Sequence, residues 1–470
     1  MTKPALELES NNASARGHVD ISLLKKHVPL RAVNSILKKA SKESIRQRFL
    51  PAQVMVYYVI AMTMFMDVSL REVVRLLFPP TRGTKCKKPP VSSAITQARQ
   101  RLGSEPLKLL YQEIVKPIAT KKTRGAWFKG LRLVAIDGST LSVADTLKNK
   151  EAFGKPKVRS GIMAFPRIFM VSLVEVGTRV LFASTMGPST TSSEMSLAKE
   201  VASSLSSGML CLADRYYCCY PFWKLATEKG ADLLFRARAD LILPMTKILP
   251  DGSYLSHLYP SAKDRQMKTN GIAVRVIEYR MPVVQNDEPF YRLITTILDH
   301  KNGTAAELAA LYEERWQIET AYDELKTHLR GGADVVLRSK TPDLVKQEFY
   351  GLLLAYFSLR AIMHEAAVST DDDPDRLSFV HALRVIKRHL PQMAACSPRK
   401  RPELHKAIIA EILQERVVIR ITRTNHRGIK RKSSHPVADR SKDRKLIMPI
   451  CNFIKILKPE KQKNHTQIVN

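Results

Sequence analysis

The sequence has few cysteines, and their spacing predicts neither a metal site nor a disulfide framework. No two of the six have the Cys-x-x-Cys spacing of a zinc site. A reducing, cytoplasmic location is therefore expected. Clusters of histidine and cysteine offer no competing metal site, and no Gly-rich phosphate loop is present. The absence of a GxSxG elbow argues against nucleophilic hydrolases. The six residues are Cys86, Cys211, Cys218, Cys219, Cys396 and Cys451.

Long hydrophobic runs are missing as well. Residues 1–17 contain no apolar run of the kind that a signal peptide has. The apolar stretches at residues 54–66 and 349–363 are shorter than the ~20 residues that a bilayer requires. Ser358 and Arg360 also interrupt the second stretch. Both stretches predict buried core helices, and no membrane association is expected.

Acidic residues are scarce relative to basic ones. The chain has 76 Lys and Arg residues against 44 Asp and Glu residues, a formal net charge of +32. A surplus of this size favours a polyanionic partner, and nucleic acid is the commonest. A membrane surface is the weaker alternative, because the basic residues are spread over the whole chain and do not flank one apolar helix.

The chain has enough apolar sequence for a large folded protein. Its 470 residues are 44% hydrophobic, which excludes a disordered chain and predicts two or three domains. Residues 21–117 have a helical pattern throughout. A helix predicted at residues 93–102, ended by Gly103, carries Arg99 and other long polar side chains, which face either DNA or solvent.

Near Gly125 the pattern changes from helix to strand. Strands are predicted at 131–136, 168–176 and 179–184, followed by a helix that starts at a capping-box spacing, Thr191 to Glu194, and a strand at 209–213. Asp137 follows the first of these strands and Asp214 follows the last. Because ligands usually bind at the carboxyl ends of strands in an open sheet, this order predicts an α/β fold with a site.

A β-rich insertion is predicted at residues 216–300, with strands at 233–237, 273–281 and 291–298. It explains the long separation between Asp214 and the next motif better than a single loop, which compact domains rarely contain. A helix at 344–366 follows, and an acidic stretch at 370–375 predicts a solvent-exposed break. Beyond residue 397 the chain is strongly basic. We expect a last short element at 407–419 and then a mostly flexible basic tail, residues 423–470.

One segment, residues 312–326, combines an anchoring face with a polar face. It contains no Gly or Pro and is predicted to be one helix. Ile318, Tyr322, Leu325 and Leu329 form an apolar stripe that docks the helix. At about 100° per residue, four polar side chains share a neighbouring arc of roughly 60°. They suit a phosphodiester, although ion pairs on a solvated helix would give the same spacing. The four are Tyr312, Arg315, Glu319 and Lys326.

Three carboxylates lie on elements that can converge in an α/β fold: Asp137, Asp214 and Glu319. Hard oxygen ligands favour Mg²⁺ or Mn²⁺, and two such ions suit an in-line displacement at a phosphodiester. Each Asp alone is weak evidence, because an Asp after a strand is more often a helix cap or a turn residue.

The spacing Tyr312-x2-Arg315-x3-Glu319-x6-Lys326 resembles the YREK signature of bacterial DDE transposases of the insertion-sequence-4 group. The segments around Asp137 (Ala-Ile-Asp-Gly-Ser) and Asp214 (Leu-Ala-Asp-Arg-Tyr-Tyr) resemble the first two catalytic segments of that group. The resemblance covers roughly residues 48 to 363 and does not extend over the basic tail.

The resemblance implies a ribonuclease-H-like catalytic domain with a β-strand insertion between the second Asp and the Glu. Asp137, Asp214 and Glu319 would then bind the metal ions and perform catalysis. Tyr312, Arg315 and Lys326 would hold DNA phosphates near the cut. Trp316 lies inside the signature, and its neighbour Ile318 favours packing in the core over stacking.

The expected activity is therefore DNA transposition by cut and paste. The chain would bind the terminal inverted repeats of its own element, free the 3′ ends and join them to target DNA, with hairpin intermediates at the element ends implied by the resemblance. A dimer is expected on double-stranded DNA, because two ends must be joined. The expected domains are a helical DNA-binding region (1–124), a catalytic domain (125–395, including the insertion at 216–300) and a basic tail (396–470).

Three alternatives stay open. A DNA nuclease on the same fold would cleave without strand transfer. A catalytically inactive, transposase-derived DNA-binding protein would bind without cutting, although the complete acidic triad argues against decay. An unrelated basic structural protein would explain the charge and none of the spacing.

Overall fold

The computed structural model contains two compact units, which are described separately. Unit 1 consists of Met1–Trp127, Ile136–Ser204 and Gln317–Val417, and unit 2 of Phe128–Ala135, Leu205–Trp316 and Val418–Asn470. The residues described are 22–44, 50–77, 90–158, 161–238, 240–280, 290–332, 335–417 and 454–457. Both units combine helices with strands, so the predicted α/β class is confirmed at this level.

The N-terminal part of unit 1 is helical, as predicted. Helix α3 is buried on all sides, which follows from a largely apolar sequence in which Gln53, in the first turn, and Thr63 are the exceptions. Pro51 precedes its first turn in an extended conformation, and Gly103 ends α5 with a φ of 72°. The helices are α1 (Ser22–His27), α2 (Leu30–Lys39), α3 (Ala52–Met64), α4 (Leu70–Leu77), α5 (Ser92–Leu102) and α6 (Glu105–Ile114).

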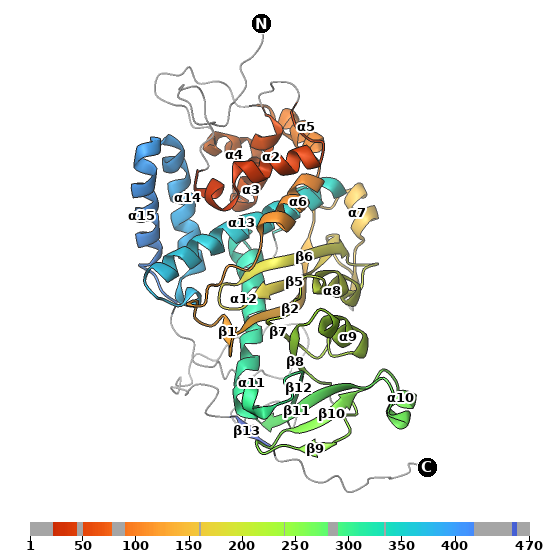
Figure 1. Ribbon diagram of the computed structural model, residues 1–470. Coiled ribbons are helices and arrows are strands. Elements are labelled where there is room, and N and C mark those ends of the chain that lie inside the picture. The colour runs from red at the N-terminus through yellow and green to blue at the C-terminus, as the bar shows by residue number, and fades with distance from the viewer. Residues whose placement is uncertain are drawn as a thin grey trace, which may run out of the picture. The chain divides into compact units, whose positions relative to one another are not determined.

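Helix α13 (Pro342–Ser369) is the central helix of unit 1 and contacts α3 and α6 (Figure 1). It also contacts α14 (Phe379–Ala395) and α15 (Arg401–Ile412). Among the described residues it is the one helix long and apolar enough to cross a membrane, but 89% of its apolar window is buried inside the protein. The expected helix at 344–366 is thus confirmed and is slightly longer.

Unit 1 also contains an antiparallel pair, β5 (Arg167–Glu175) and β6 (Val180–Pro188), next to β2 (Leu131–Ser142). The two strands are joined at Gly177, whose φ of 84° suits glycine. Helix α8 (Glu194–Ala202) packs on both strands. Its N-cap is Ser193, which accepts a hydrogen bond from the backbone of Ser196, so the capping box predicted at residues 191–194 is wrong. The smaller elements are α7 (Leu147–Phe153), β3 (Lys157–Val158) and β4 (Gly161–Ile162).

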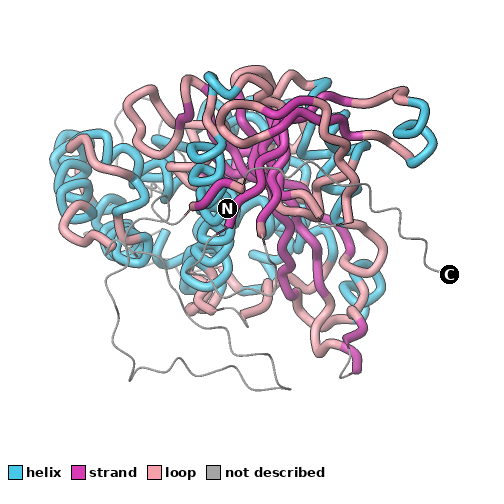
Figure 2. Tube along the Cα trace, turned by 90° about the horizontal axis from the view of Figure 1, so that it is seen from below, coloured by secondary structure: helices cyan, strands magenta, loops and turns pink. Residues whose placement is uncertain are grey.

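Unit 2 is built on one sheet with the strand order β2-β7-β8-β12-β11-β10-β9. Figure 2 shows the strands in magenta. Strands β2, β7 and β8 are parallel, and Ala135 pairs with Leu212. The remaining pairs are antiparallel. The strands are β1 (Trp127–Phe128), β7 (Met209–Ala213), β8 (Asp232–Arg236), β9 (Lys247–Ile248), β10 (Tyr254–Leu258), β11 (Ile272–Arg280) and β12 (Tyr291–Thr295), and the helices are α9 (Tyr220–Glu228), α10 (Ala262–Met267) and α11 (Ala305–Tyr312).

Several predictions about the C-terminal part need correction. The acidic stretch at 370–375 is not fully exposed, since Pro374 is buried and Asp375 pairs with buried arginines. The last short element, predicted at residues 407–419, is α15, which begins at Arg401 and ends at Ile412. Most of the expected flexible tail lies outside the described residues. One piece of it, β13 (Lys455–Ile456), pairs with β11 and is therefore an ordered strand.

Candidate functional site

The signature segment is helical throughout, but it is not one regular helix. Helix α11 ends at Tyr312 and a 3₁₀ turn follows, Glu313–Arg315. Helix α12 (Trp316–Asp323) then continues into a π-helical stretch, Glu324–Leu329. The shared arc calculated at 100° per residue is therefore wrong, because the hydrogen-bonding pattern changes three times between Tyr312 and Lys326. Short π segments occur often at functional sites, and this one contains Lys326.

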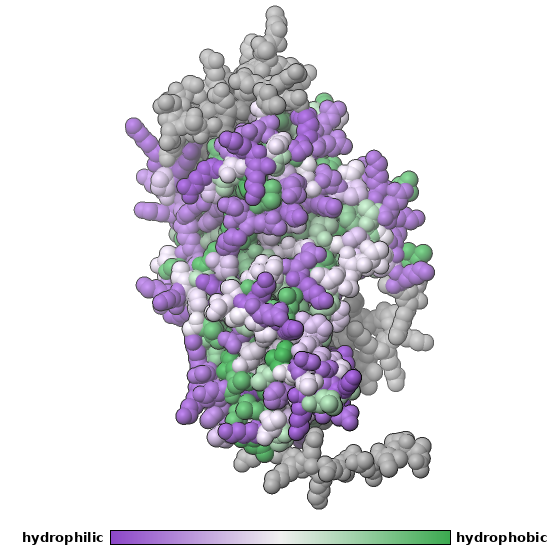
Figure 3. Space-filling view, turned by 45° about the vertical axis from the view of Figure 1, so that its right-hand side comes forward, coloured by the Kyte–Doolittle hydropathy of each residue, from purple (hydrophilic) through white to green (hydrophobic). Residues whose placement is uncertain are grey.

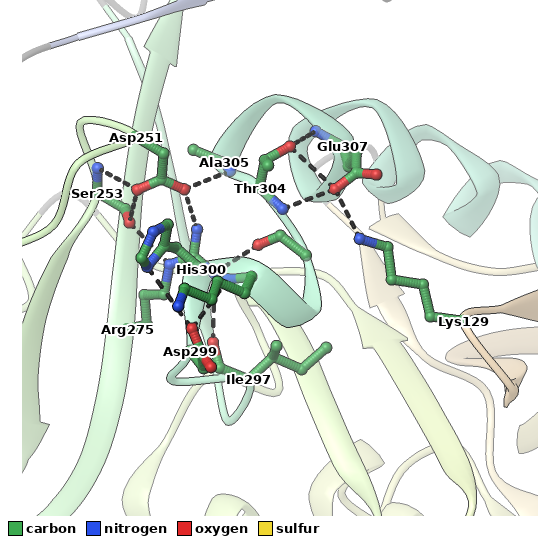
Figure 4. A network of polar contacts seen from close by, with 12 residues as sticks. Lys129, Asp251, Ser253, Arg275, Ile297, Asp299, His300, Thr304, Ala305 and Glu307 are labelled. Atoms are coloured by element: carbon green, nitrogen blue, oxygen red, sulfur yellow. Dashed lines mark hydrogen bonds and ion pairs between the residues drawn. The ribbon is translucent and has the colours of Figure 1, made fainter.

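The start of α11 is fixed by a dense polar network in unit 2 (Figure 4). Thr304 and Glu307 form a complete capping box. Asp251 accepts a hydrogen bond of 2.7 Å from the backbone nitrogen of Ala305 and forms an ion pair with the buried Arg275. Arg275 also donates to the carbonyl oxygen of Gly303 at 2.6 Å. Burial alone would raise the pKa of Asp251, but hydrogen bonds from Ser253 and Ala305 and the charge of Arg275 leave it lowered. The helix that leads into the signature is thus held at its first turn.

Tyr312 is buried, and its hydroxyl donates a hydrogen bond of 3.2 Å to the backbone oxygen of Ala213. Burial raises the pKa of this phenol, which therefore stays protonated. The expected contact between the Tyr312 hydroxyl and a DNA phosphate is not supported, since the donor already has a partner inside the core. Tyr312 instead connects the signature to the end of β7.

Asp214 directly follows β7, as predicted. Its carboxylate accepts a hydrogen bond of 2.9 Å from the backbone nitrogen of Tyr216, which is an Asx-turn geometry. Asp214 therefore forms a turn, as an aspartate after a strand commonly does. Asp214 belongs to unit 2, together with Tyr312 and Arg315.

Asp137 does not lie after its strand, because β2 continues to Ser142. The pairing with β7 stops at Ala135, so Asp137 stands two residues beyond that pairing, and Asp214 stands two residues beyond Leu212. The Asp137 carboxylate accepts a hydrogen bond of 2.8 Å from the backbone nitrogen of Gly138. Its carbonyl oxygen accepts one of 2.6 Å from the hydroxyl of Tyr322 on α12.

A carboxylate that sequence reasoning did not single out lies beside Asp137. A Cβ atom on Gly138 would stand 2.5 Å from Oε1 of Glu194, so the glycine leaves room for the carboxylate in its present position. The sequence predicts for Glu194 only a place at the start of a helix. Burial and the charge of Asp137 raise the pKa of Tyr322 in the same region, and Glu194 contributes in the same direction.

Glu319 lies on α12 in unit 1 and is partly exposed. The predicted apolar stripe is confirmed, because Ile318, Tyr322, Leu325 and Leu329 are all buried. Trp316 is 47% exposed, so the expectation that it packs in the core is wrong. The guanidinium of Arg315 lies 5.2 Å from the centre of the Trp316 ring, which is a cation–π contact.

Lys326 lies within a group of basic side chains in unit 1. Its ammonium donates a hydrogen bond of 3.0 Å to the hydroxyl of Ser139 on β2. Burial lowers its pKa, and the neighbouring charges of Arg330 and Arg167 lower it further. Burial also lowers the pKa of Arg330, to about 10, while Glu348 opposes the shift. A lysine beside a hydroxyl and near two arginines is an environment that favours an anion.

A buried ionic network holds the π-helical stretch in place, and sequence reasoning missed it. Glu324 accepts from Arg179 at 2.8 Å and from the hydroxyl of Tyr356 at 2.7 Å. Arg360 lies 3.5 Å from the same carboxylate, and Asp375 pairs with both arginines. The network joins the β5–β6 hairpin, the signature segment and α13.

Carboxylate oxygens are donors that a hard divalent cation prefers, and the three predicted ligands are all carboxylates. Asp137 and Glu319 belong to unit 1, and Asp214 belongs to unit 2. Within the described residues of the chain, no three His, Cys, Asp or Glu side chains gather closely enough to hold a metal ion.

Arg99 of the N-terminal region faces neither DNA nor solvent: it is buried and donates to Gln347 and Ser339 at 2.8 Å each.

Comparison with known families gives two matches that follow one another along the chain. Residues 18–112 match the insertion element 4 transposase N-terminal model, and residues 128–358 match the transposase DDE domain model. The chain belongs to the DDE transposases of the insertion element 4 family. It is accordingly an enzyme that acts on DNA, and divalent metal dependence is general for this domain. The family resemblance inferred from the signature is confirmed.

Individual relatives agree with this assignment. The transposase InsG for insertion sequence element IS4 from Escherichia coli (strain K12) is 28% identical over 404 residues, covering 85% of this chain and 89% of the relative. The putative transposase InsZ from the same organism is 24% identical over 211 residues, covering 45% of this chain and 69% of the relative. A piggyBac transposase synaptic complex with hairpin DNA covers 85% of this chain at 10% identity, but its TM-score of 0.42 is too low to support an argument about the fold.

Proposed function

We propose that this DDE transposase moves its own insertion sequence by cut and paste. It binds the terminal inverted repeats, cleaves at the element ends and transfers the freed 3′ ends to target DNA. Family membership and the complete signature, from Tyr312 to Lys326, are the observations that carry this proposal. Two ends must be held together for joining, so the active form on double-stranded DNA is a dimer. The protein works in the cytoplasm of a bacterium, where the element's DNA lies.

The catalytic residues of the proposal are Asp137, Asp214 and Glu319. They would hold two Mg²⁺ ions, for which Mn²⁺ would substitute, and the bound ions would supply activation of the attacking oxygen and charge stabilisation of the leaving one. The parallel register supports the pair of aspartates, since each stands two residues beyond a paired position, Ala135 or Leu212. Tyr322 and Gly138 bond to Asp137, and Tyr312 bonds next to Asp214, so both strands are held by groups that bind no substrate.

Lys326 and Arg315 are the proposed phosphate-binding residues. The cations around Lys326 and the hydroxyl of Ser139 support this role, because an entering phosphate would offset the burial and the repulsion from Arg330 and Arg167 that lower the lysine pKa. Tyr312 is assigned a positioning role for Asp214 instead. The proposed domains are a helical DNA-binding region (residues 1–124), a ribonuclease-H-like catalytic domain (125–395) with its inserted strands (216–300), and a basic tail (396–470).

The test uses purified full-length protein and labelled DNA that carries the terminal repeats flanking its reading frame. Glu319→Gln should retain binding in a gel shift and lose cleavage and joining under Mg²⁺ and Mn²⁺. Asp323→Asn is the matched control, because Asp323 lies on the same helix with its side chain 59% exposed and should keep full activity. Wild-type cleavage without joining would favour the nuclease, and binding without cleavage would favour the inactive DNA-binding protein. Full activity of Glu319→Gln would remove Glu319 from the site.

The metal assignment has a readout that does not depend on turnover. Mn²⁺ binding to the protein–DNA complex, followed by electron paramagnetic resonance, should weaken in Asp137→Asn, Asp214→Asn and Glu319→Gln. It should stay unchanged in Asp323→Asn. Equal Mn²⁺ binding in all four variants would contradict the assignment.

A further inference from the structure

The exposed face of helix α2 has an unusual composition. Arg31, Asn34, Ser35, Lys38 and Lys39 are all exposed, and together they form what we name the α2 polar face. At about 100° per residue these five positions span an arc of roughly 140°. Within the described part of the chain, none of these side chains takes part in an ion pair. In Figure 3, hydrophilic side chains gather over the upper part of the molecule, where the N-terminal helices lie.

The opposite face of α2 holds the helix firmly on unit 1. Val33, Ile36 and Leu37 are buried, and the helix packs on α3 and α6. The buried hydroxyl of Tyr57 donates a hydrogen bond of 2.8 Å to the carbonyl oxygen of Val28, which lies just before α2. The α2 polar face is thus displayed by a rigid support, which favours recognition over a loosely attached arm.

An ordinary solvated helix explains part of this face, but not all of it. Lys38 and Lys39 lie in the last turn, where cations interact favourably with the helix dipole. Arg31 lies in the first turn, which is the unfavourable end for a cation, and no acidic residue offsets it there. Residues 21–42 contain no Asp or Glu at all.

Helix α4 provides the contrast within the same region. Its Glu72 lies in the first turn and pairs with Arg75 at 2.6 Å, which is the arrangement of a solvated helix with balanced charge. The α2 polar face lacks such a balance. The uncompensated cations therefore point to a partner that supplies the negative charge.

The order of side chains along α2 fits one particular polyanion. The two short hydrogen-bonding residues, Asn34 and Ser35, lie in the middle, and the long cations lie toward both ends. A helix of this length measures about 15 Å, and the DNA major groove, about 12 Å wide, admits an α-helix. In the groove, the central residues come closest to base edges, where Asn pairs with adenine, while the terminal cations meet phosphates.

We propose that α2 is the recognition helix for the element ends and lies in the major groove of the terminal repeat. This assignment rests on the proposed function, because it presumes that the chain binds its own ends. Asn34 reads a base, with Ser35 beside it. Arg31, Lys38 and Lys39 bind the phosphates that flank the groove.

The test is a metal-free gel shift with the full chain, on one duplex with the element end and one of scrambled sequence. Lys38→Gln/Lys39→Gln should weaken binding to both duplexes and reduce the slope of log affinity against log salt by about 2. Asn34→Ala should weaken binding to the element end by roughly tenfold and leave the scrambled duplex unchanged. The charge-matched control is Lys121→Gln/Lys122→Gln, two exposed lysines after α6. Thermal unfolding of each variant shows that it is folded.

Two results would overturn the inference: a loss with the α2 lysine pair no larger than with the control pair, or an equal effect of Asn34→Ala on both duplexes. Cleavage of element-end DNA by the wild type in Mg²⁺ is measured in parallel. Normal cleavage with unaffected α2 variants means that α2 is the wrong helix and that the transposase proposal stands. If the wild type does not cleave but the α2 variants show the expected losses of binding, α2 is the recognition helix and the transposase proposal is wrong.

Discussion

The hydroxyl of Tyr312 donates its hydrogen to the backbone oxygen of Ala213, the residue before Asp214, at 3.2 Å. A residue of the signature thus fixes the end of the strand that carries a proposed metal ligand. The distinction from a phosphate-binding role is measurable, because a bond within the core affects folding and geometry, whereas a phosphate contact affects the salt dependence of binding.

Tyr312→Phe should lower the free energy of unfolding by about 1 kcal/mol, the usual value of one buried hydrogen bond. Cleavage should slow, since the strand end is less firmly held, while the salt dependence of DNA binding stays unchanged. Urea denaturation and gel shifts at several salt concentrations measure the two effects. Lys326→Gln is the comparison variant and should reduce the salt slope by about 1. A similar reduction in Tyr312→Phe would restore the phosphate contact originally expected.

Gly138→Ala should slow DNA cleavage strongly, although it adds only one methyl group. The new Cβ atom would stand 2.5 Å from the carboxylate of Glu194 and 2.9 Å from the ring of Phe169, so these side chains or the strand beside Asp137 must move. A displacement of about 1 Å near reacting groups costs up to roughly 100-fold in rate. The measurement is single-turnover cleavage of element-end DNA. Adding Glu194→Ala removes one of the two obstacles and should restore part of the rate. A fully active Gly138→Ala protein would show that this part of β2 tolerates movement.

The sequence predicted the elements whose signals are local. Strand β7 was found with its observed bounds, because Gly208 and Asp214 border a short apolar run. The position of Asp137 was misjudged, because Gly138-Ser139-Thr140 has turn composition, yet β2 continues through it as part of a sheet. Pairing with distant strands overrode the local preference there.

Other features depend on residues far apart in the chain and leave no local signal. Arg179 and Glu324 are 145 positions apart, and neither has a neighbour in sequence that predicts their ion pair. The π-helical stretch around Lys326 has ordinary helix-forming composition, so only the structure reveals it. The signature identified the family correctly from spacing alone, but it did not show which of its side chains are buried.

Lys326→Met should stabilise the free protein while it weakens DNA binding. Burial lowers the pKa of Lys326 below its ordinary value of 10.5, so at neutral pH the charged lysine destabilises the fold. This deficit shrinks as the pH rises from the folded pKa toward 10.5, because the unfolded chain then holds the extra proton. The melting temperature of the wild type should therefore approach that of the variant at alkaline pH. Equal melting temperatures at pH 7 would contradict the lowered pKa.

Glu324→Gln should be severely destabilising, in contrast to a charge removal on the surface. Glu324 is 4% exposed, and its loss of charge leaves Arg179 and Arg360 with only Asp375 to offset two buried cations. Breaking a buried pair in this way costs about 3–5 kcal/mol. The control is Glu72→Gln, which removes an exposed partner of Arg75 and should cost less than about 1 kcal/mol.

Urea denaturation of both variants measures this difference.

Because Glu324 lies five residues after Glu319, milder substitutions in the network should also slow cleavage while DNA binding persists. Tyr356→Phe is the suitable one, since it removes a single hydrogen bond of 2.7 Å to Glu324 and no charge. If Tyr356→Phe lowers stability by about 1 kcal/mol and leaves the cleavage rate unchanged, the network stabilises unit 1 without positioning the signature. A slower rate at full DNA occupancy would show that the network also holds Glu319 in place.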